Sequence, residues 1–567
     1  MFRAMPTTTL PPRLHGRLLP RLGMAGLLLA LLSACERRSG CTGDYCGTFV
    51  IAAAGEPDIL LPPVSELAAS RDVYDQLFLK LADLGTSGNT LGDEDFQPQL
   101  AERWEWDGPV TLVFHLDPRA RWQDGEAVTA ADVVFTYDTY NDSLVNSPFR
   151  SSLRLISAVT ARDSLTAVFR FRERYPEMFY DAVYHMRILP AHLLRTIPRD
   201  QWRSAAFGRA PVGDGPYRFV GWKAGESLEL AADSAFFLGR PHIRRVIFRF
   251  TPNLQVVTTQ LVAAEADVTE QLGSPDNVKR VQAAPQLVTY PYKGSAYGYL
   301  GFNLAAPGDT TKPHPLFGDR ELRRALAMAV DRTRLLRNVF GDFAKVPPGP
   351  LSQLTWIWDP ETRELPHDSA QAVRLLARLG WVDSDSDGVR DRAGQKLAFR
   401  ILVPTTSAIR RQYARLLQEQ FRTIGAEVEL DEVDLGLFSE RTRAGRFDAV
   451  LYTWNTDPTP SSGIPQTWTQ AGLGRSNHGR YVNPAFDRLV DRAVAATNRA
   501  EARRTWRAAI ELLNQDAPAI FLFAPDAVAA AHRRITDVTI RPDSWLALLR
   551  TWRIPGDRLT DRDRAER

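Results

Sequence analysis

The chain lacks most of the motifs by which enzymes are recognised in a sequence. Its 567 residues include three cysteines and nine histidines. They contain no His-Glu-x-x-His or other close histidine pair, no Gly-x-Ser-x-Gly and no phosphate-binding glycine loop. No long apolar run follows the one that ends at Leu32. The sequence therefore predicts neither an enzyme nor a multi-span membrane protein.

The net charge of the chain is also small. The formal charge is +3, but residues 1–34 hold four arginines and no acid, which leaves about −1 for the remainder. A nucleic-acid-binding protein would show a basic face or stripe, so no nucleic-acid partner is expected. With 44% hydrophobic residues, a chain of this length is expected to fold into two or three domains.

The N-terminal segment has the three parts of a secretory signal. Arg13, Arg17 and Arg21 precede an apolar run over 24–32, and Leu32-Ser33-Ala34-Cys35 resembles a lipobox. Residues 1–34 are then a signal peptide, Cys35 carries the lipid, and 35–46 form a linker. The expected location is a membrane-anchored lipoprotein on the periplasmic or extracellular face. The alternative is an ordinary signal peptide with an incidental cysteine.

The two remaining cysteines, Cys41 and Cys46, lie just after the expected anchor. They are compatible with a small disulfide in an oxidising compartment. Two free thiols in the linker are equally compatible with this spacing.

Periodicity predicts alternating strands and helices. Residues 111–116 alternate as in a strand, and Thr129 with Asp132 predicts a capped helix start. A strand over 398–403, a helix from about Ser407 and a strand over 426–430 form a βαβ unit. A further helix is expected to begin at Asp368 and end at Gly380.

Several motifs occur in a fixed order along the chain, and together they resemble the family 5 extracellular solute-binding proteins. These are the dipeptide-, oligopeptide- and nickel-binding components of ABC importers. The family usually has threonine where this chain has Asp214, in a turn. The matching stretches are Trp122–Val133, Pro211–Tyr217, Gly301-Phe302-Asn303, Arg323–Arg332, Asn477, Tyr481–Pro484 and Asp487.

The resemblance implies an α/β fold, a two-lobed periplasmic-binding-protein clamp of type II with an extra domain inserted in the first lobe. The chain is expected to pass between the lobes at two hinge segments, called crossings below, near Tyr292 and near Pro518. A polar tail over 557–567 is expected to be disordered. The expected segments are 47–70, 190–292 and 516–556 for the first lobe, 71–189 for the inserted domain and 293–515 for the second lobe.

The implied function is the substrate-binding component of an ABC importer, which captures oligopeptide-like solutes and delivers them to a permease. The implied partners are the ABC permease and ATPase subunits, with the protein itself a monomer. An alternative keeps the fold but binds a nickel chelate, haem, opine or sugar. A surface hydrolase and a calcium-stabilised adhesion module are further alternatives with little support in the sequence.

The segment from Tyr452 to Pro458 resembles the family segment that lines the ligand cleft. There a tryptophan is followed three residues later by an aspartate that meets the α-ammonium group of a peptide, as Trp454 and Asp457 are spaced here. The expected ligand-binding residues are Tyr452, Trp454, Asn455 and Asp457. In a competing alignment Asp457-Pro458 only starts a turn.

An acidic loop follows the start of a calcium-binding motif. Asp383, Asp385 and Asp387 occupy positions one, three and five, and glycine occupies position six. Position twelve is Gly394, so the usual glutamate is missing, and Asp391 at position nine is the substitute ligand. The alternatives are a structural calcium ion and a solvated acidic hairpin turn. No other cofactor is expected.

Overall fold

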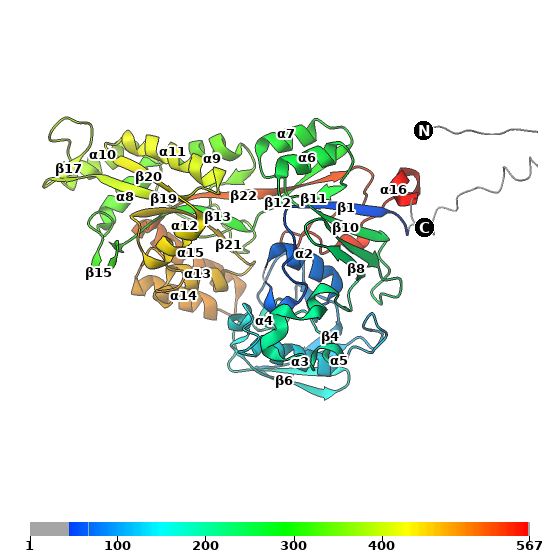
Figure 1. The fold of residues 1–567 in the computed structure, drawn as a ribbon. Coiled ribbons are helices and arrows are strands. Elements are labelled where there is room, and N and C mark those ends of the chain that lie inside the picture. Colours follow the sequence, from blue (N-terminus) through cyan, green and yellow to red (C-terminus); the bar gives the residue numbers. More distant parts are fainter. Residues whose placement is uncertain (1–44, 66, 565–567) are drawn as a thin grey trace, which may run out of the picture.

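The computed structural model describes residues 45–65 and 67–564. Its central feature is a twelve-stranded mixed sheet that extends through two lobes (Figure 1). The strand order is β20-β19-β21-β13-β22-β11-β1-β10-β9-β8, and β12 and β16 also pair with β22. These strands are β1 (Thr48–Ala53), β8 (Tyr217–Lys223), β9 (Ser227–Ala232), β10 (Arg245–Phe250), β11 (Val268–Thr269), β12 (Leu287–Lys293), β13 (Ala296–Phe302), β16 (Ala344–Lys345), β19 (Ala398–Pro404), β20 (Glu427–Val433), β21 (Ala449–Asn455) and β22 (Ala519–His532).

Strand β22 belongs to both lobes and crosses the middle of the molecule in Figure 1. Its first part pairs with β13 in the second lobe, and residues 526–532 pair with β12 in the first lobe. The crossing therefore falls inside the strand, at Ala524 and Pro525, and not near Pro518 as expected. The other crossing lies between β12 and β13, next to Tyr292, where it was predicted.

The two crossings pack directly against each other. A Cβ atom added to Gly294 would lie 2.2 Å from the carbonyl oxygen of Pro525. Only glycine permits this approach of one backbone to the other. The two strands that connect the lobes are thus held at one point.

Helices cover both faces of the sheet in the second lobe. Along β22, Ile520 and Leu522 face one core, whereas Ala519 and Phe521 face the other, as the alternation of a strand requires. Both faces of the strand are consequently buried. The first core is covered by α8 (Arg320–Ala329), α9 (Arg332–Phe340), α10 (Ser369–Arg378) and α11 (Ala408–Arg422), and the opposite side carries α12 (Leu435–Ala444), α13 (Pro460–Trp468), α14 (Pro484–Ala495) and α15 (Arg499–Asp516) (Figure 1).

The first lobe has helices on both faces of its part of the sheet and carries a separate four-stranded domain. On one face, α6 (Leu254–Val262) and α7 (Pro275–Gln282) pack against β1 and β22. The other face packs on α2 (Ala68–Leu77) and continues into the four-stranded sheet, ordered β4-β5-β7-β6. That domain contains β4 (Ala101–Trp106), β5 (Thr111–Leu116), β6 (Ile156–Asp163), β7 (Thr166–Phe171), α3 (Ala130–Asn141), α4 (Met178–Val183) and α5 (Ala191–Leu194).

The remaining strands form three short hairpins. They are β2 (Ala82–Leu84) with β3 (Phe96–Pro98), β14 (Ala305–Ala306) with β15 (Asp309–Pro313), and β17 (Asp391–Arg392) with β18 (Gln395–Lys396).

The local predictions from the sequence are confirmed where a clear cap or period supported them. Thr129 and Asp132 form a capping box at the start of α3, and the backbone N–H of Thr129 donates to Asp132 at 2.9 Å. Strands β19 and β20 run parallel on either side of α11 in sequence, which completes the βαβ unit. Asp368 caps α10 by accepting a hydrogen bond from the N–H of Gln371.

The segment expected to be disordered from residue 557 is structured up to α16 (Asp561–Arg564). Asp563 is buried and accepts hydrogen bonds from the N–H of Thr48 and from Arg534, at 2.6 and 2.8 Å. Arg534 also pairs with Asp267 at 2.6 Å. This buried network ties α16 to β1, and Figure 1 shows the two side by side.

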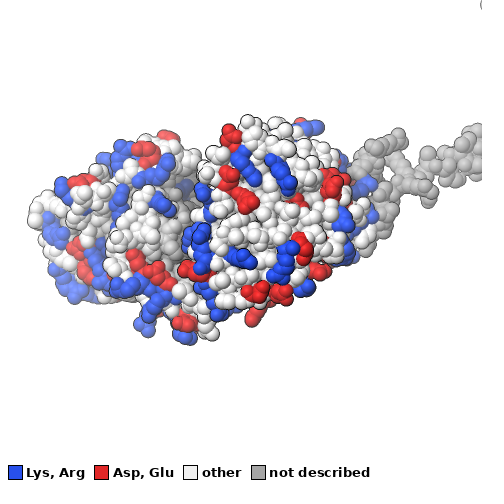
Figure 2. Space-filling view, turned by 90° about the horizontal axis from the view of Figure 1, so that it is seen from below, with Lys and Arg blue, Asp and Glu red and all other residues white. Residues whose placement is uncertain are grey.

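The surface is balanced in charge, as the composition predicts. In Figure 2, lysine and arginine side chains are interspersed with aspartate and glutamate over the face shown. Such a mixture provides no extended field of one sign on that face.

We expect Gly294→Ala to lower the free energy of unfolding by about 1–3 kcal/mol, because its methyl group must displace the backbone at Pro525. Thermal denaturation followed by circular dichroism measures the effect. The matched control is Gly221→Ala in β8, where an added Cβ meets no atom within 4 Å. Equal melting temperatures for the two variants would contradict the close packing of the crossings.

Candidate functional site

A cavity of about 1650 Å³ lies between the lobes. Its wall combines residues of the first lobe, the four-stranded domain, the two crossings and the second lobe. Most small-molecule sites enclose about 300–1,000 Å³. The cavity therefore has room for a ligand larger than a typical small molecule.

The end of β21 supplies part of the second-lobe wall. Trp454, Asn455 and Asp457 line the cavity, as the sequence led us to expect. Tyr452 is not among the lining residues. It packs behind Trp454 against Phe438 of α12, with ring centroids 5.9 Å apart.

One backbone edge of β21 is open next to the cavity. The strand pairs with β13 along its whole length, but with β19 only through Ala449 and Val450. Beyond Val450, the other edge has no strand partner in the described chain. An extended ligand segment could add to this edge through main-chain hydrogen bonds.

Asp457 presents a carboxylate that the described residues leave without a hydrogen-bond or ion-pair partner. It is half-buried at the cavity wall. Helix α13 is capped by Thr459, which accepts from the N–H of Ser461 at 3.0 Å, so Asp457 does not serve as the cap. A half-buried carboxylate of this kind is suited to a positively charged ligand group.

The opposite wall is formed around α4. Glu177, Asp181 and His185 are spaced by four residues, and all three line the cavity. Glu177 accepts hydrogen bonds from the hydroxyls of Thr90 and Thr459, both at 2.5 Å. Because Thr459 belongs to the second lobe, this carboxylate joins the four-stranded domain to the second lobe across the cavity.

Burial shifts the pKa values of the titratable side chains in this wall. It raises the pKa of Glu177 and, with the charge of Glu177, raises the pKa of Asp181 to about 8. Burial also lowers the pKa of His185 to about 4, so its imidazole is neutral at neutral pH. The wall thus combines two acids whose pKa values are raised with a neutral histidine.

Aromatic rings form the surface between these groups. Tyr180 and Tyr184 stack with centroids 4.6 Å apart, and His185 stacks on Phe149 at 5.5 Å. The buried Tyr180 hydroxyl has no hydrogen-bond partner within the described residues. Rings of this kind can contact apolar and cationic ligand groups.

Sequence reasoning did not single out the α4 wall as part of the site. The spacing of Glu177, Asp181 and His185 by four residues was the available signal, although only Asp181 lies within α4, with Glu177 just before it and His185 just after it. That spacing alone does not show that these residues line a cavity, because the second-lobe wall comes from a segment nearly three hundred residues away.

The acidic loop lies away from the cavity. Oxygen atoms of Asp383, Asp385 and Asp387 lie within 4.8 Å of one another. Asp391 is not in that group: it accepts a hydrogen bond from the N–H of Ser384 at 3.0 Å. Lys396 contacts Asp387, where its ammonium group competes with a cation. Calcium binding at this loop stays a prediction.

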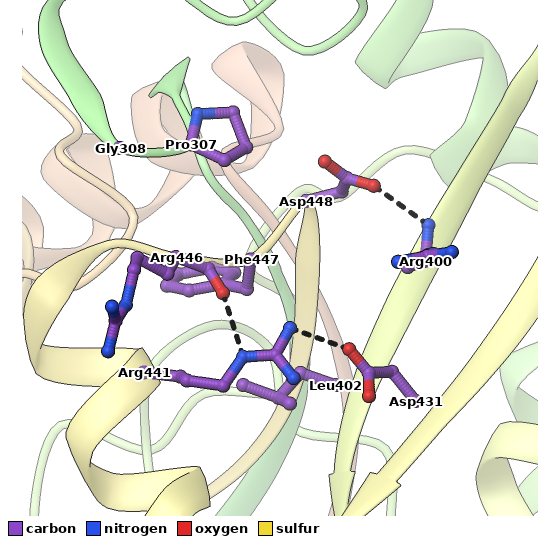
Figure 3. A pocket seen from close by; sticks show the side chains of 9 residues that line it. All are labelled: Pro307, Gly308, Arg400, Leu402, Asp431, Arg441, Arg446, Phe447 and Asp448. Carbon is purple, nitrogen blue, oxygen red and sulfur yellow. Dashed lines mark hydrogen bonds and ion pairs between the residues drawn. The ribbon is translucent and has the colours of Figure 1, made fainter.

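A smaller pocket of about 420 Å³ lies on the second lobe (Figure 3). Three arginines line it, but each is paired with an acid. Arg441 contacts Asp431 at 2.6 Å, Arg400 contacts Glu429 at 2.9 Å, and Arg446 contacts Glu440. This pocket therefore offers no uncompensated charge to a ligand, unlike the cavity between the lobes.

The expected anchor and residues 35–44 of the expected linker lie outside the described residues, which include neither Cys35 nor Cys41, whereas Cys46 is described and buried. Among the helices of residues 45–65 and 67–564, none has both the length and the apolar character needed to cross a bilayer.

The architecture is that of a two-lobed binding protein, and comparison with known proteins gives its family. The model of the bacterial extracellular solute-binding proteins, family 5 (middle), matches residues 95–474. The chain belongs to this family, whose members are solute-binding proteins of the extracellular or periplasmic space.

The similarity extends over nearly the whole chain in individual relatives. The oligopeptide-binding protein AppA of Bacillus subtilis is 25% identical, over 94% of this chain and 97% of its own. The structure of AppA with a nonapeptide has a TM-score of 0.74 at 24% identity and covers 91% of this chain and 100% of AppA. NikZ of Campylobacter jejuni with Ni(L-His) has a TM-score of 0.73 at 22% identity, with coverages of 89% and 99%. The structural matches establish the fold.

We expect the pH dependence of stability to change in Asp181→Asn. An unfolded aspartate titrates near pH 4, whereas Asp181 titrates at about 8 in the folded protein. Between these values the folded state holds a proton that the unfolded state has lost, so stability falls as pH rises. The variant lacks this proton and should gain in melting temperature relative to the wild type between pH 5 and pH 9.

The control for this comparison is Asp107→Asn, which alters a solvent-exposed carboxylate. The difference in melting temperature between Asp107→Asn and the wild type should be similar at pH 5 and at pH 9. A pH-independent effect of Asp181→Asn would show that the Asp181 carboxyl titrates normally.

Proposed function

We propose that this protein is the substrate-binding component of an ABC importer, and that it captures an oligopeptide between its lobes for delivery to a membrane permease. The observation that carries the proposal is the partnerless carboxylate of Asp457 beside the open edge of β21. The N-terminal part of a peptide matches both features: its ammonium group can pair with the carboxylate, and its backbone can add to the open strand edge.

The ammonium group is proposed to pair with Asp457. Removal of an ammonium from water is costly unless a carboxylate compensates it. The peptide main chain then follows the open edge of β21, which gives affinity without selecting side chains. Trp454 and Asn455 lie beside this path and contact the first residues of the peptide.

The open strand edge favours a peptide over the other ligand classes of the fold. A nickel chelate, haem, opine or sugar has no extended main chain to pair with it. AppA, which is similar along nearly its entire length, is named for oligopeptides. The ligand is released unchanged, since the proposed role is binding and transport without turnover.

The proposed cellular setting follows from the N-terminal segment. Cys35 carries a lipid that holds the protein on the periplasmic or extracellular face of a membrane. There the protein acts as a monomer with the ABC permease and ATPase subunits. The anchor keeps the loaded protein close to its permease.

Asp457→Ala is expected to weaken peptide binding by about 2–5 kcal/mol, because the ligand ammonium loses its partner. Isothermal titration calorimetry with an unmodified peptide and its N-acetylated form measures the effect. The wild type should bind the acetylated form much more weakly, whereas Asp457→Ala should hardly distinguish the two.

Asp107→Ala, which removes an exposed carboxylate remote from the cavity, is the control and should bind like the wild type. If Asp457→Ala bound the unmodified peptide as tightly as the wild type does, the ammonium pairing would be refuted.

Cys35→Ala is expected to move the protein from the membrane fraction to the soluble fraction, because the lipid attachment site is lost. Cell fractionation with immunodetection measures the distribution. Cys41→Ala is the matched control and should stay with the membrane. Retention of Cys35→Ala in the membrane fraction would contradict lipidation at Cys35.

A further inference from the structure

The cavity between the lobes is strongly acidic. Nine carboxylates line it, against four arginines and no lysine. On the face shown in Figure 2, basic and acidic side chains are interspersed, whereas acids predominate in the wall of the cavity. A cleft with low-dielectric walls strengthens such a field, which favours ligands with positive charge.

Most buried acids of the first lobe are paired with arginines. Asp75 contacts Arg187 at 2.7 Å, and Asp543 contacts Arg541 at 2.7 Å. These pairs explain how the fold tolerates the charges. Carboxylates in such pairs stabilise the fold.

Asp72 and Glu270 are exceptions to this pairing. Asp72 lies on α2, Glu270 directly follows β11, and both line the cavity. Neither carboxylate lies within ion-pair distance of a basic side chain among the described residues. Burial raises the pKa of both, and the charge of Glu270 adds to the increase at Asp72, whereas the nearby charge of Arg71 lowers the pKa of both acids. Arg71 is thus near the two acids but forms no ion pair with either.

Trp545 adds an independent observation at the same place. It is only 4% exposed, lines the cavity, and its indole N–H has no partner within hydrogen-bond distance. The indole lies close enough to Asp72 to favour the ionised carboxylate. A ligand that enters here meets two carboxylates and the buried indole ring of Trp545, whose N–H is directed towards Asp72, and this arrangement suits an organic cation.

This group of residues is distinct from the ammonium site at Asp457. Both groups of residues line the same cavity, with Tyr184 also in its wall. Asp72 and Glu270 belong to the first lobe, whereas Asp457 belongs to the second. A ligand that reaches both must carry two separated positive charges.

We infer that Asp72 and Glu270, with Trp545, form a second cation subsite that selects peptides with a lysine or arginine side chain. The inference rests on the proposed function, because it takes the cavity to be the peptide site. A divalent metal ion suits the subsite less well, since two carboxylates provide few of the oxygen ligands that it needs.

The test uses alanine pentapeptides with one lysine or one norleucine, moved from position two to position five. The two side chains have similar aliphatic stems, and only lysine carries a charge. We expect the wild-type protein to bind the lysine peptide at least tenfold more tightly at one position, measured by calorimetry. Asp72→Asn and Glu270→Gln should each reduce this ratio towards one.

Asp107→Asn is the control, since it removes an exposed carboxylate remote from the cavity and should keep the lysine preference. Equal binding of lysine and norleucine peptides by the wild type would overturn the subsite while leaving peptide binding intact. A preference unchanged in both Asp72→Asn and Glu270→Gln would also overturn it. Failure of every peptide to bind would overturn the proposed function and the subsite together.

Discussion

The shared strand β22 is the constraint on which the arrangement of the lobes depends. Its hydrogen bonds to β13 and to β12 make one sheet out of two halves, so neither lobe has a free sheet edge at the junction. Within residues 45–65 and 67–564, the chain also passes between the lobes at Gly294, whose missing side chain lets the two backbones touch. A hinge motion of the lobes would be absorbed by the few residues around Gly294 and Pro525, and the cavity opens directly beside them.

The distribution of charge separates the framework from the site. Several buried acids of the framework are matched by arginines, as in Asp267 with Arg534, because an unmatched buried charge would destabilise the fold. Around the cavity, Asp457, Asp72 and Glu270 have no such partner. Their desolvation is a cost in the free protein that a cationic ligand can offset. The desolvation cost that arginine pairing offsets elsewhere in the fold is left in the cavity for a ligand to offset.

The sequence could predict what depends on near neighbours. The Thr129 cap, the βαβ unit and the segment from Trp454 to Asp457 all rest on spacings of a few residues, and the structure has these elements where they were expected. It could not predict that Glu177 would face Thr459, because only the tertiary fold brings them together. The order of residues 557–564 was missed for a similar reason. A polar segment was expected to be disordered, but one buried contact between Asp563 and Arg534 fixes it.

The contact of Glu177 with Thr459 bears on how closure and binding are coupled. Burial and the charge of Asp457 raise the pKa of Glu177, and burial and the charge of Glu177 raise the pKa of Asp181. The hydrogen bond from Thr459 joins the second lobe to this group of acids. A cation beside Asp457 would offset the charge of Asp457 at Glu177 without breaking this bond. A positively charged ligand would then favour the arrangement in which Glu177 meets Thr459, and a difference in affinity between two arrangements is what can drive closure.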